Sequence, residues 1–294
     1  MEILIKSDLN KILWLNFIQE CRLNPEESLP DKIIINLKNC SFLEPFHVVS
    51  LACLIEEFIL LEIPIEFVEG ENLELLEYLT GINFFLFWNL KDRGSFLQNS
   101  KASNMPLWKI NPTMITQYIV QVQNYYEQNH LKSFSVEPLY HTLAETFNNI
   151  LDHSKSKIFG YCITQYYPNK NKLKIAVCDF GKGISKTVND FLLDASGNAL
   201  PDHIAISKAF ELGFSSKSNT RNKGFGLDTI KVIVESSNGL LRVIANKGCF
   251  TYINGKYADY NIRGCFNGTI LEIVLDTTTF EEKDSEELAF DMEL

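Results

Sequence analysis

Short apolar runs alternate with an amphipathic stretch in the first hundred residues, and this order predicts a small α/β unit. Residues 33–37 and 63–68 are rich in β-branched side chains, which is typical of buried strands. Between them, residues 48–61 repeat apolar side chains at the spacing of a helix. A strand, a helix and a strand in this order favour a right-handed unit with parallel strands. A further helix is expected over 72–80, and Gly81 would end it.

The pattern changes after residues 98–106, a polar segment that we predict to be a linker. Beyond it, helical spacing predicts helices at 111–131, 138–154, 201–212 and 227–236. Apolar runs predict strands at 173–178, 240–245, 250–253 and 269–275, with glycine-containing turns at 246–248, 254–255 and 267–268. The sequence therefore predicts a domain at 1–100, a second domain at 101–278 and an acidic tail at 279–294.

Composition narrows the class of protein. The 294 residues are 46% hydrophobic and 22% charged, which excludes a disordered or fibrous chain. The net charge of −10 lies largely in the tail and argues against a general nucleic-acid binder. The seven scattered cysteines form no CxxC pair, so we expect reduced thiols rather than a zinc site or a disulfide framework. Without a signal peptide or a long apolar segment, we expect a cytoplasmic protein that does not contact a membrane.

The first of three polar groups in the second domain lies on the helix predicted at 138–154. Glu145, Asn149 and Asp152 share one face of this helix, opposite an apolar face. A carboxylate four residues before an amide oxygen suits a general base beside a ligand of a hard cation. For this helix alone, a solvated polar face is the other interpretation.

The second group directly follows the strand predicted at 173–178. Asp179 leaves the end of this strand and can accept a hydrogen bond from an amino group. Gly181 and Gly183 allow a ligand to approach the backbone closely. A simple turn from strand to loop would also account for the two glycines.

The third group leads into the helix predicted at 227–236. Hydroxyl, amide and cationic side chains fill residues 215–223, and Gly224 and Gly226 follow. Free N–H groups and the positive end of the helix dipole make such a helix start a phosphate site. A surface loop before a glycine-rich helix start is the alternative. The P-loop, Rossmann and protein-kinase signatures are absent from the sequence.

In this order, the three groups resemble the motifs of the GHKL superfamily of ATP-binding domains, which includes gyrase, histidine kinases and anti-sigma-factor kinases. ETFNNILDH (145–153) resembles the N-box, and DFGKG (179–183) and GFGL (224–227) resemble the two glycine boxes. NGT and the apolar run after it (267–275) resemble the closing segment. The resemblance implies an α/β fold with a C-terminal Bergerat-type α/β sandwich, a mixed sheet, and ATP and Mg²⁺ as ligands.

Carried over by position, the resemblance also implies a role for each residue. Glu145 would be the catalytic general base, and Asn149 would be the Mg²⁺ ligand. Asp179 would accept the adenine amino group, and Thr269 would hold a water molecule beside it. The other ATP-binding residues that it implies are Asp152, Gly181, Gly183, Lys217, Gly224, Phe225, Gly226 and Leu227.

Residues 33–58 resemble, more loosely, the STAS fold of anti-sigma-factor antagonists. That family carries a phosphorylatable serine at the helix start after an acidic residue, where this chain has Glu44-Pro45-Phe46-His47. The resemblance therefore implies a STAS-like binding module that has lost the phosphorylation switch. An unrelated α/β accessory domain is the alternative.

Together these features predict a regulatory Mg-ATP-binding protein. ATP would close a lid at 214–223 through Lys217 and thereby control an unidentified protein partner, with hydrolysis or phosphotransfer. The alternatives are a serine/threonine kinase of the anti-sigma-factor type acting in trans and a non-catalytic, ATP-dependent interaction module. None of the five histidines precedes an acidic residue, which argues against a histidine autokinase. A homodimer stays open, and we expect no direct nucleic-acid binding.

Overall fold

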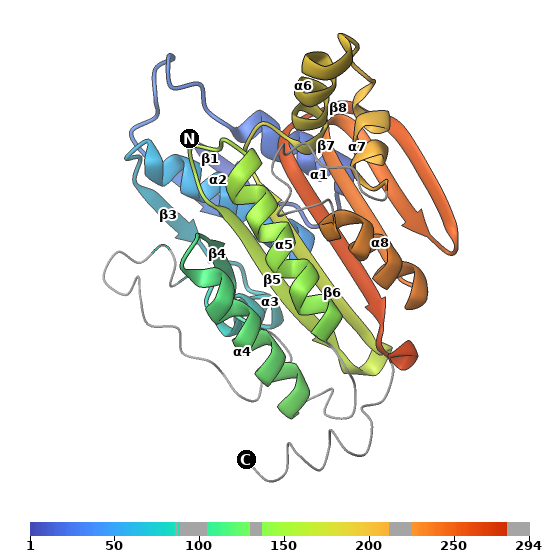
Figure 1. Cartoon of the computed structure of the whole chain (residues 1–294). Coiled ribbons are helices and arrows are strands. Elements are labelled where there is room, and N and C mark those ends of the chain that lie inside the picture. The colour runs from blue at the N-terminus through green and yellow to red at the C-terminus, as the bar shows by residue number, and fades with distance from the viewer. Residues whose placement is uncertain (86–87, 89–104, 130–136, 212–224, 281–294) are drawn as a thin grey trace.

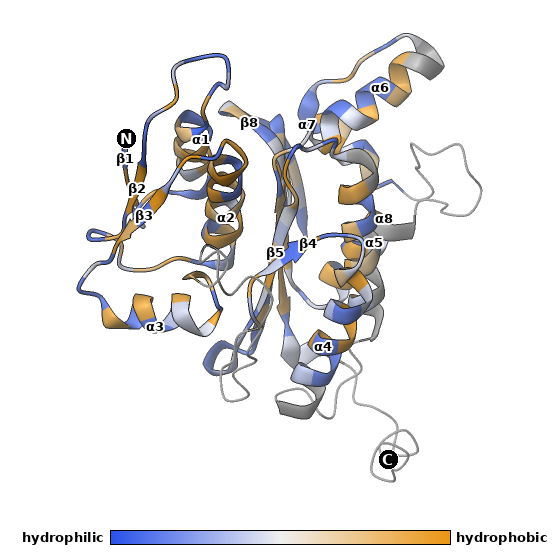
Figure 2. Cartoon of the chain, turned by 90° about the vertical axis from the view of Figure 1, so that its left-hand side faces the viewer, coloured by the Kyte–Doolittle hydropathy of each residue, from blue (hydrophilic) through white to orange (hydrophobic). Residues whose placement is uncertain are grey.

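The structure is a computed structural model that describes residues 1–85, 88, 105–129, 137–211 and 225–280. Its elements stack in four layers (Figures 1 and 2). A small sheet lies outermost, two helices follow, a larger sheet comes next, and the remaining helices cover the far face of the larger sheet. The α/β fold class expected from the sequence is confirmed.

The N-terminal unit contains the small sheet. Its elements are β1 (Glu2–Leu4), α1 (Lys11–Cys21), β2 (Ile33–Asn36), α2 (Pro45–Leu60), β3 (Ile65–Val68) and α3 (Leu73–Gly81). The three strands are parallel in the order β1-β2-β3. The predicted strand–helix–strand unit is thus confirmed as β2, α2 and β3, whereas β1 and α1 were not predicted.

The C-terminal unit contains the larger sheet. Its elements are β4 (Trp108–Ile110), α4 (Met114–Asn129), α5 (Glu137–His153), β5 (Gly160–Tyr167), β6 (Lys172–Asp179), α6 (Ile184–Ser196), α7 (Asp202–Ala209), α8 (Phe225–Ser236), β7 (Leu240–Ile253) and β8 (Lys256–Asp276). The strand order is β4-β5-β6-β8-β7, and all the described pairings are antiparallel, where a mixed sheet was expected.

Strands β7 and β8 form one long hairpin where the sequence suggested several shorter strands. The turn at Asn254 and Gly255 is confirmed, and both residues have the positive φ typical of a tight hairpin. The turn expected at 246–248 is instead a bulge within β7, where the register shifts around Asn246. The turn expected at 267–268 lies inside β8.

Helices α1 and α2 bury the face of the larger sheet that the outer helices leave uncovered (Figure 2). On α2, the Cys53 thiol donates a hydrogen bond to the carbonyl oxygen of Cys178 on β6, at 3.4 Å. A single apolar core includes Trp14 and Phe46 from the N-terminal unit and Ile163 and Phe266 from the larger sheet. The two units therefore share a core. The predicted linker at 98–106 falls mainly outside the described residues.

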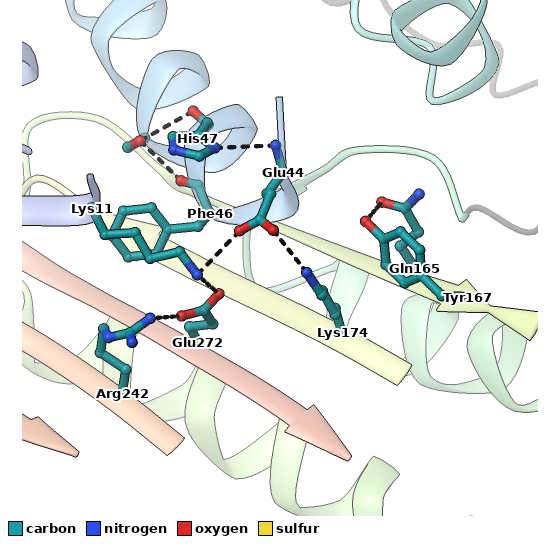
Figure 3. A network of polar contacts seen from close by, with 10 residues as sticks. Lys11, Glu44, Phe46, His47, Gln165, Tyr167, Lys174, Arg242 and Glu272 are labelled. Carbon is teal, nitrogen blue, oxygen red and sulfur yellow. Dashed lines mark hydrogen bonds and ion pairs between the residues drawn. The ribbon is translucent and has the colours of Figure 1, made fainter. Parts of the chain in front are cut away.

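An ion network joins the helix layer to the larger sheet (Figure 3). Lys11 on α1 pairs with Glu272 on β8 and lies 3.1 Å from the Glu44 carboxylate. Lys174 on β6 donates to Glu44 at 2.9 Å, and Arg242 on β7 pairs with Glu272. Burial would raise the pKa of Glu44, but the hydrogen bonds and charges of Lys174 and Lys11 lower it to about 2. Glu44 is therefore ionised at neutral pH.

The start of α2 uses the residues at which the chain departs from the STAS pattern. Pro45 occupies the first turn of the helix, where a missing N–H costs little. The backbone N–H of Glu44 donates to Nδ1 of His47 at 3.1 Å. Burial lowers the pKa of His47 to about 4, so the ring is neutral at pH 7. The start of α2 is thus closed by Glu44 and His47, and the Glu44 carboxylate also binds Lys174 of the larger sheet.

Within the described ranges, none of the helices combines the length and the apolar character that a membrane crossing requires.

Candidate functional site

Asp179, the predicted acceptor of an amino group, ends β6 and lies opposite Thr269 on β8. Its side chain is only 2% exposed, and Oδ1 accepts a hydrogen bond from the Gly181 N–H at 2.7 Å. Burial raises the pKa of Asp179 to about 7, while hydrogen bonds from Gly181 and Thr269 and the charge of Arg22 oppose this rise. A carboxylate has about four lone-pair sites, so further acceptor capacity remains for a ligand.

The two glycines after Asp179 allow this loop to pack tightly. A Cβ at Gly181 would collide with the carbonyl oxygen of Ser154. Gly183 has a φ of +86°, and a Cβ there would lie 2.5 Å from Oδ1 of Asn246. Side chains are therefore excluded at both positions by other atoms of the protein. The approach of a ligand to these glycines stays a prediction.

The C-terminal end of α5 contacts the same loop. The N–H of Lys182 donates to the carbonyl oxygen of Ser154, just after α5, at 2.5 Å. Asn149 is partly buried about one turn before the helix end. Helix α5 also packs against α8, which begins at Phe225. The structure thus brings the end of α5 and the Asp179 loop together and places α8 beside α5.

Several predicted site residues are placed only in part. Glu145 and Asp152 lie on α5 and Phe225 opens α8, but the side chains of these three residues are outside the described part of the structure. Gly226 follows Phe225 in α8. Leu227 is partly buried in α8. Lys217, Gly224 and the expected lid at 214–223 lie outside the described residues.

Asn246 and Ser185 complete this cluster, although the sequence assigned them to no site. Asn246 is 1% exposed. Its Oδ1 accepts a hydrogen bond from the Ser185 hydroxyl at 2.6 Å, and its Nδ2 donates one to the carbonyl oxygen of Lys182 at 3.3 Å. Thr269 Oγ1 accepts from the Ile184 N–H at 3.0 Å. Side chains from β7 and β8 therefore fix the loop and the first turn of α6. The sequence pattern placed Asn246 in a turn, and nothing in that pattern indicated a buried side chain.

The described residues offer few ligands for the cation of a bound nucleotide. No group of three or more His, Cys, Asp or Glu residues that could hold a metal ion occurs in the described part of the chain. A magnesium ion bound with phosphates, however, needs only one or two protein ligands. The amide oxygen of Asn149 is of the right type for such a ligand.

Replacing Asp179 with asparagine is expected to stabilise the ligand-free protein above pH 7. The pKa of Asp179 is about 7 in the folded state, against 3.8 for an exposed aspartate. Between these two pH values the carboxyl group is protonated in the folded protein and ionised in the unfolded protein. The unfolding free energy of the wild type should therefore fall as the pH rises through this window. The asparagine side chain carries no charge, and we expect the substitution to add about 1–3 kcal/mol near pH 8.

Urea unfolding of both proteins at several pH values measures this difference. The gain should shrink towards about pH 4, where the carboxyl group is protonated in the folded state. A difference that stays constant from acidic to basic pH would show that burial does not shift the titration of Asp179.

Comparisons with known proteins add little to this geometry. No protein-family model matches the chain. One similar solved structure is the ATP-binding domain of topoisomerase IV from Francisella tularensis in complex with a small-molecule inhibitor. The sequence identity is 13% and the TM-score is 0.29, over 65% of this chain and 48% of that chain. The match therefore spans about half the length of the topoisomerase domain.

Proposed function

We propose that the chain binds Mg-ATP beside the Asp179 loop and uses it to control a protein partner. The observation that carries this proposal is Asp179 itself, a buried carboxylate at a strand end with Thr269 opposite it. The adenine amino group is a hydrogen-bond donor that an ionised carboxylate accepts. Guanine presents a carbonyl oxygen at the equivalent position, which would face the carboxylate as a second acceptor. The site should therefore select adenine over guanine.

Helix α5 would supply the groups that act on the phosphates. It carries Glu145 as the general base and Asn149 as the ligand of Mg²⁺, and its end contacts the Asp179 loop. Bound Mg²⁺ would neutralise charge on the phosphates. The helix start at Gly224–Leu227 would hold them, and the lid at 214–223 would close over them through Lys217. Hydrolysis or phosphotransfer would then reset the surface that the partner contacts.

The proposal is tested by the purine preference of Asp179→Asn. Wild type should bind ATP more tightly than GTP in Mg²⁺, measured by titration calorimetry. Asp179→Asn should lose about tenfold or more in ATP affinity, the size expected when a hydrogen bond to a charged group is removed. Asp190→Asn is a matched control, since this neighbouring carboxylate is 58% exposed and pairs only with Lys182 among the described contacts. Equal binding of ATP and GTP by wild type would refute the adenine contact.

A second prediction concerns the cation. Asn149→Ala should weaken ATP binding strongly in Mg²⁺ and have little effect in EDTA, because the lost amide oxygen acts only through the metal. Asn148→Ala is the matched control, since Asn148 is exposed on the same helix. If Asn149→Ala weakened binding equally in both buffers, Asn149 would not be the metal ligand.

A further inference from the structure

Arg22 follows α1 and is held in a fixed orientation by α2. Its side chain is 17% exposed. Its Nε donates to Oε2 of Glu57 at 3.0 Å, and its Nη2 donates to Oε1 at 2.7 Å. Two parallel hydrogen bonds to one carboxylate fix the plane of the guanidinium group as well as its position.

The same guanidinium group contacts both strands of the Asp179 site. Its central carbon lies 4.3 Å from the ring centroid of Phe180, the residue after Asp179. Its Nη1 donates to the carbonyl oxygen of Asn267 at 2.6 Å. Asn267 stands two residues before Thr269, which pairs with Asp179. Arg22 therefore connects the N-terminal unit to β6 and β8 at the point where the two predicted adenine-site residues meet.

Gln19 on α1 completes this contact. Its Oε1 accepts a hydrogen bond from the N–H of Asn267 at 2.8 Å, so both backbone polar groups of Asn267 bind the end of α1. The next residue, Gly268, has a φ of +147°, and a Cβ there would collide with the carbonyl oxygen of Asp179. Because the strands approach so closely here, a shift of Asn267 would move Thr269 relative to Asp179.

We infer that Arg22 is a positioning residue for the nucleotide site, through which the N-terminal unit sets the adenine affinity of the C-terminal unit. The inference rests on the proposed function. Arg22 acts through Phe180 and Asn267, and no side chain of the N-terminal unit needs to touch the nucleotide. The N-terminal unit then serves as a built-in regulator, because any partner that displaces the end of α1 would also loosen the adenine site.

The charges around Asp179 support this role. Burial raises the pKa of Asp179, and the charge of the Arg22 guanidinium, just after α1, opposes this rise. Burial raises the pKa of Cys178, the residue before Asp179, so this thiol is neutral, and Cys53 on α2 donates to its carbonyl oxygen. Lys182, in the loop, pairs with Asp190. Loss of the Arg22 charge would therefore raise the pKa of Asp179 further and leave more of the carboxyl group protonated at neutral pH.

Arg22→Gln tests the inference with two readouts. The first is the affinity for Mg-ATP, measured by calorimetry between about pH 6 and pH 8.5. We expect this affinity to fall about tenfold near pH 7 and the midpoint of its pH dependence to move to higher pH. The second is the titration of the Asp179 carboxyl group in the ligand-free protein. It is followed by NMR of ¹³C-labelled aspartate and assigned with Asp179→Asn, and its midpoint should also move upward.

Three further variants separate positioning from general stability. Arg22→Lys keeps the charge and should restore the Asp179 midpoint while recovering only part of the ATP affinity. In Arg22→Gln the Glu57 carboxylate loses its partner, which could prevent folding. The double variant Arg22→Gln/Glu57→Gln removes that carboxylate as well, and it replaces the single variant in both measurements if the single variant does not fold. Lys32→Gln is the matched control, since it removes a cation from an exposed ion pair with Glu66 in the same unit. It should change neither readout.

The outcomes distinguish this inference from the proposed function. Unchanged ATP affinity and an unchanged Asp179 midpoint in folded Arg22→Gln would overturn the positioning role, even if wild type binds ATP. If the Asp179 midpoint moves but wild type binds no ATP, the electrostatic link between the two units stands and the proposed nucleotide function fails.

Discussion

Replacing Glu145 with alanine is expected to abolish ATP turnover while leaving Mg-ATP affinity within a few-fold of wild type. A general base contributes roughly 10²–10⁴ to the rate and little to ground-state binding. The assay incubates protein with γ-labelled ATP and Mg²⁺ and separates free phosphate from labelled protein. Asn148→Ala, an exposed position on the same helix, should keep wild-type turnover. Unchanged turnover in Glu145→Ala would remove Glu145 from the chemistry.

The same assay distinguishes the three candidate activities. Free phosphate without labelled protein indicates an ATPase, and labelling of another protein in a lysate indicates a kinase acting in trans. ATP binding without turnover by wild type leaves the non-catalytic interaction module. In that case Glu145→Ala would have nothing to abolish, and the catalytic part of the proposal would fail while nucleotide binding stood.

Glu272→Gln should lower the free energy of unfolding by about 2–4 kcal/mol, because Arg242 loses its described charged partner and Lys11 keeps only Glu44. The Glu272 side chain is 4% exposed and pairs with Lys11 from α1 and Arg242 from β7. Glutamine has nearly the same size, so the loss reports the charge rather than a cavity. Urea unfolding with fluorescence detection measures the difference.

Glu66→Gln is the matched control for this prediction. It also removes one carboxylate from an ion pair with a lysine, but the Glu66 side chain is 53% exposed. An exposed pair contributes about 0–1 kcal/mol, so this variant should be close to wild type. Salt should reduce the small effect of Glu66→Gln more than the larger effect of Glu272→Gln, because buried pairs are screened less. Similar losses in the two variants would contradict the proposed importance of the interface network.

The elements predicted most accurately are those with one apolar and one polar face. Helix α5 was expected at 138–154 and lies at Glu137–His153, because only one of its faces packs on the sheet. Strand β5 was missed because most of it is buried on both faces, so its sequence shows no alternation. Helix α1, which lies between the two sheets (Figure 2), was also missed. Its apolar residue Leu13 is 50% exposed, so apolar side chains do not mark one face of this helix.

The candidate site was predictable where its residues are close in the sequence. Asp179, Gly181 and Gly183 follow a recognisable strand, and the structure confirms that Asp179 ends β6 beside Thr269. Arg22 was not predictable, because its contact with Asn267 joins residues 245 positions apart. Only the packing of the helix layer on the larger sheet brings these residues together, and no local pattern encodes that packing.

The shared core also has a consequence for how the chain is made. Lys11 and Glu272, which pair in the finished protein, are separated by 261 positions. At roughly 5–20 residues per second, a ribosome needs on the order of tens of seconds to reach β8 after α1 and α2 have emerged. Helix α2 can pack on β5 and β6 within that interval, but α1 packs on β8, so its side facing the larger sheet stays uncovered until β8 is made. Synthesis of β8 is therefore the event that covers α1, after β5 and β6 have covered α2.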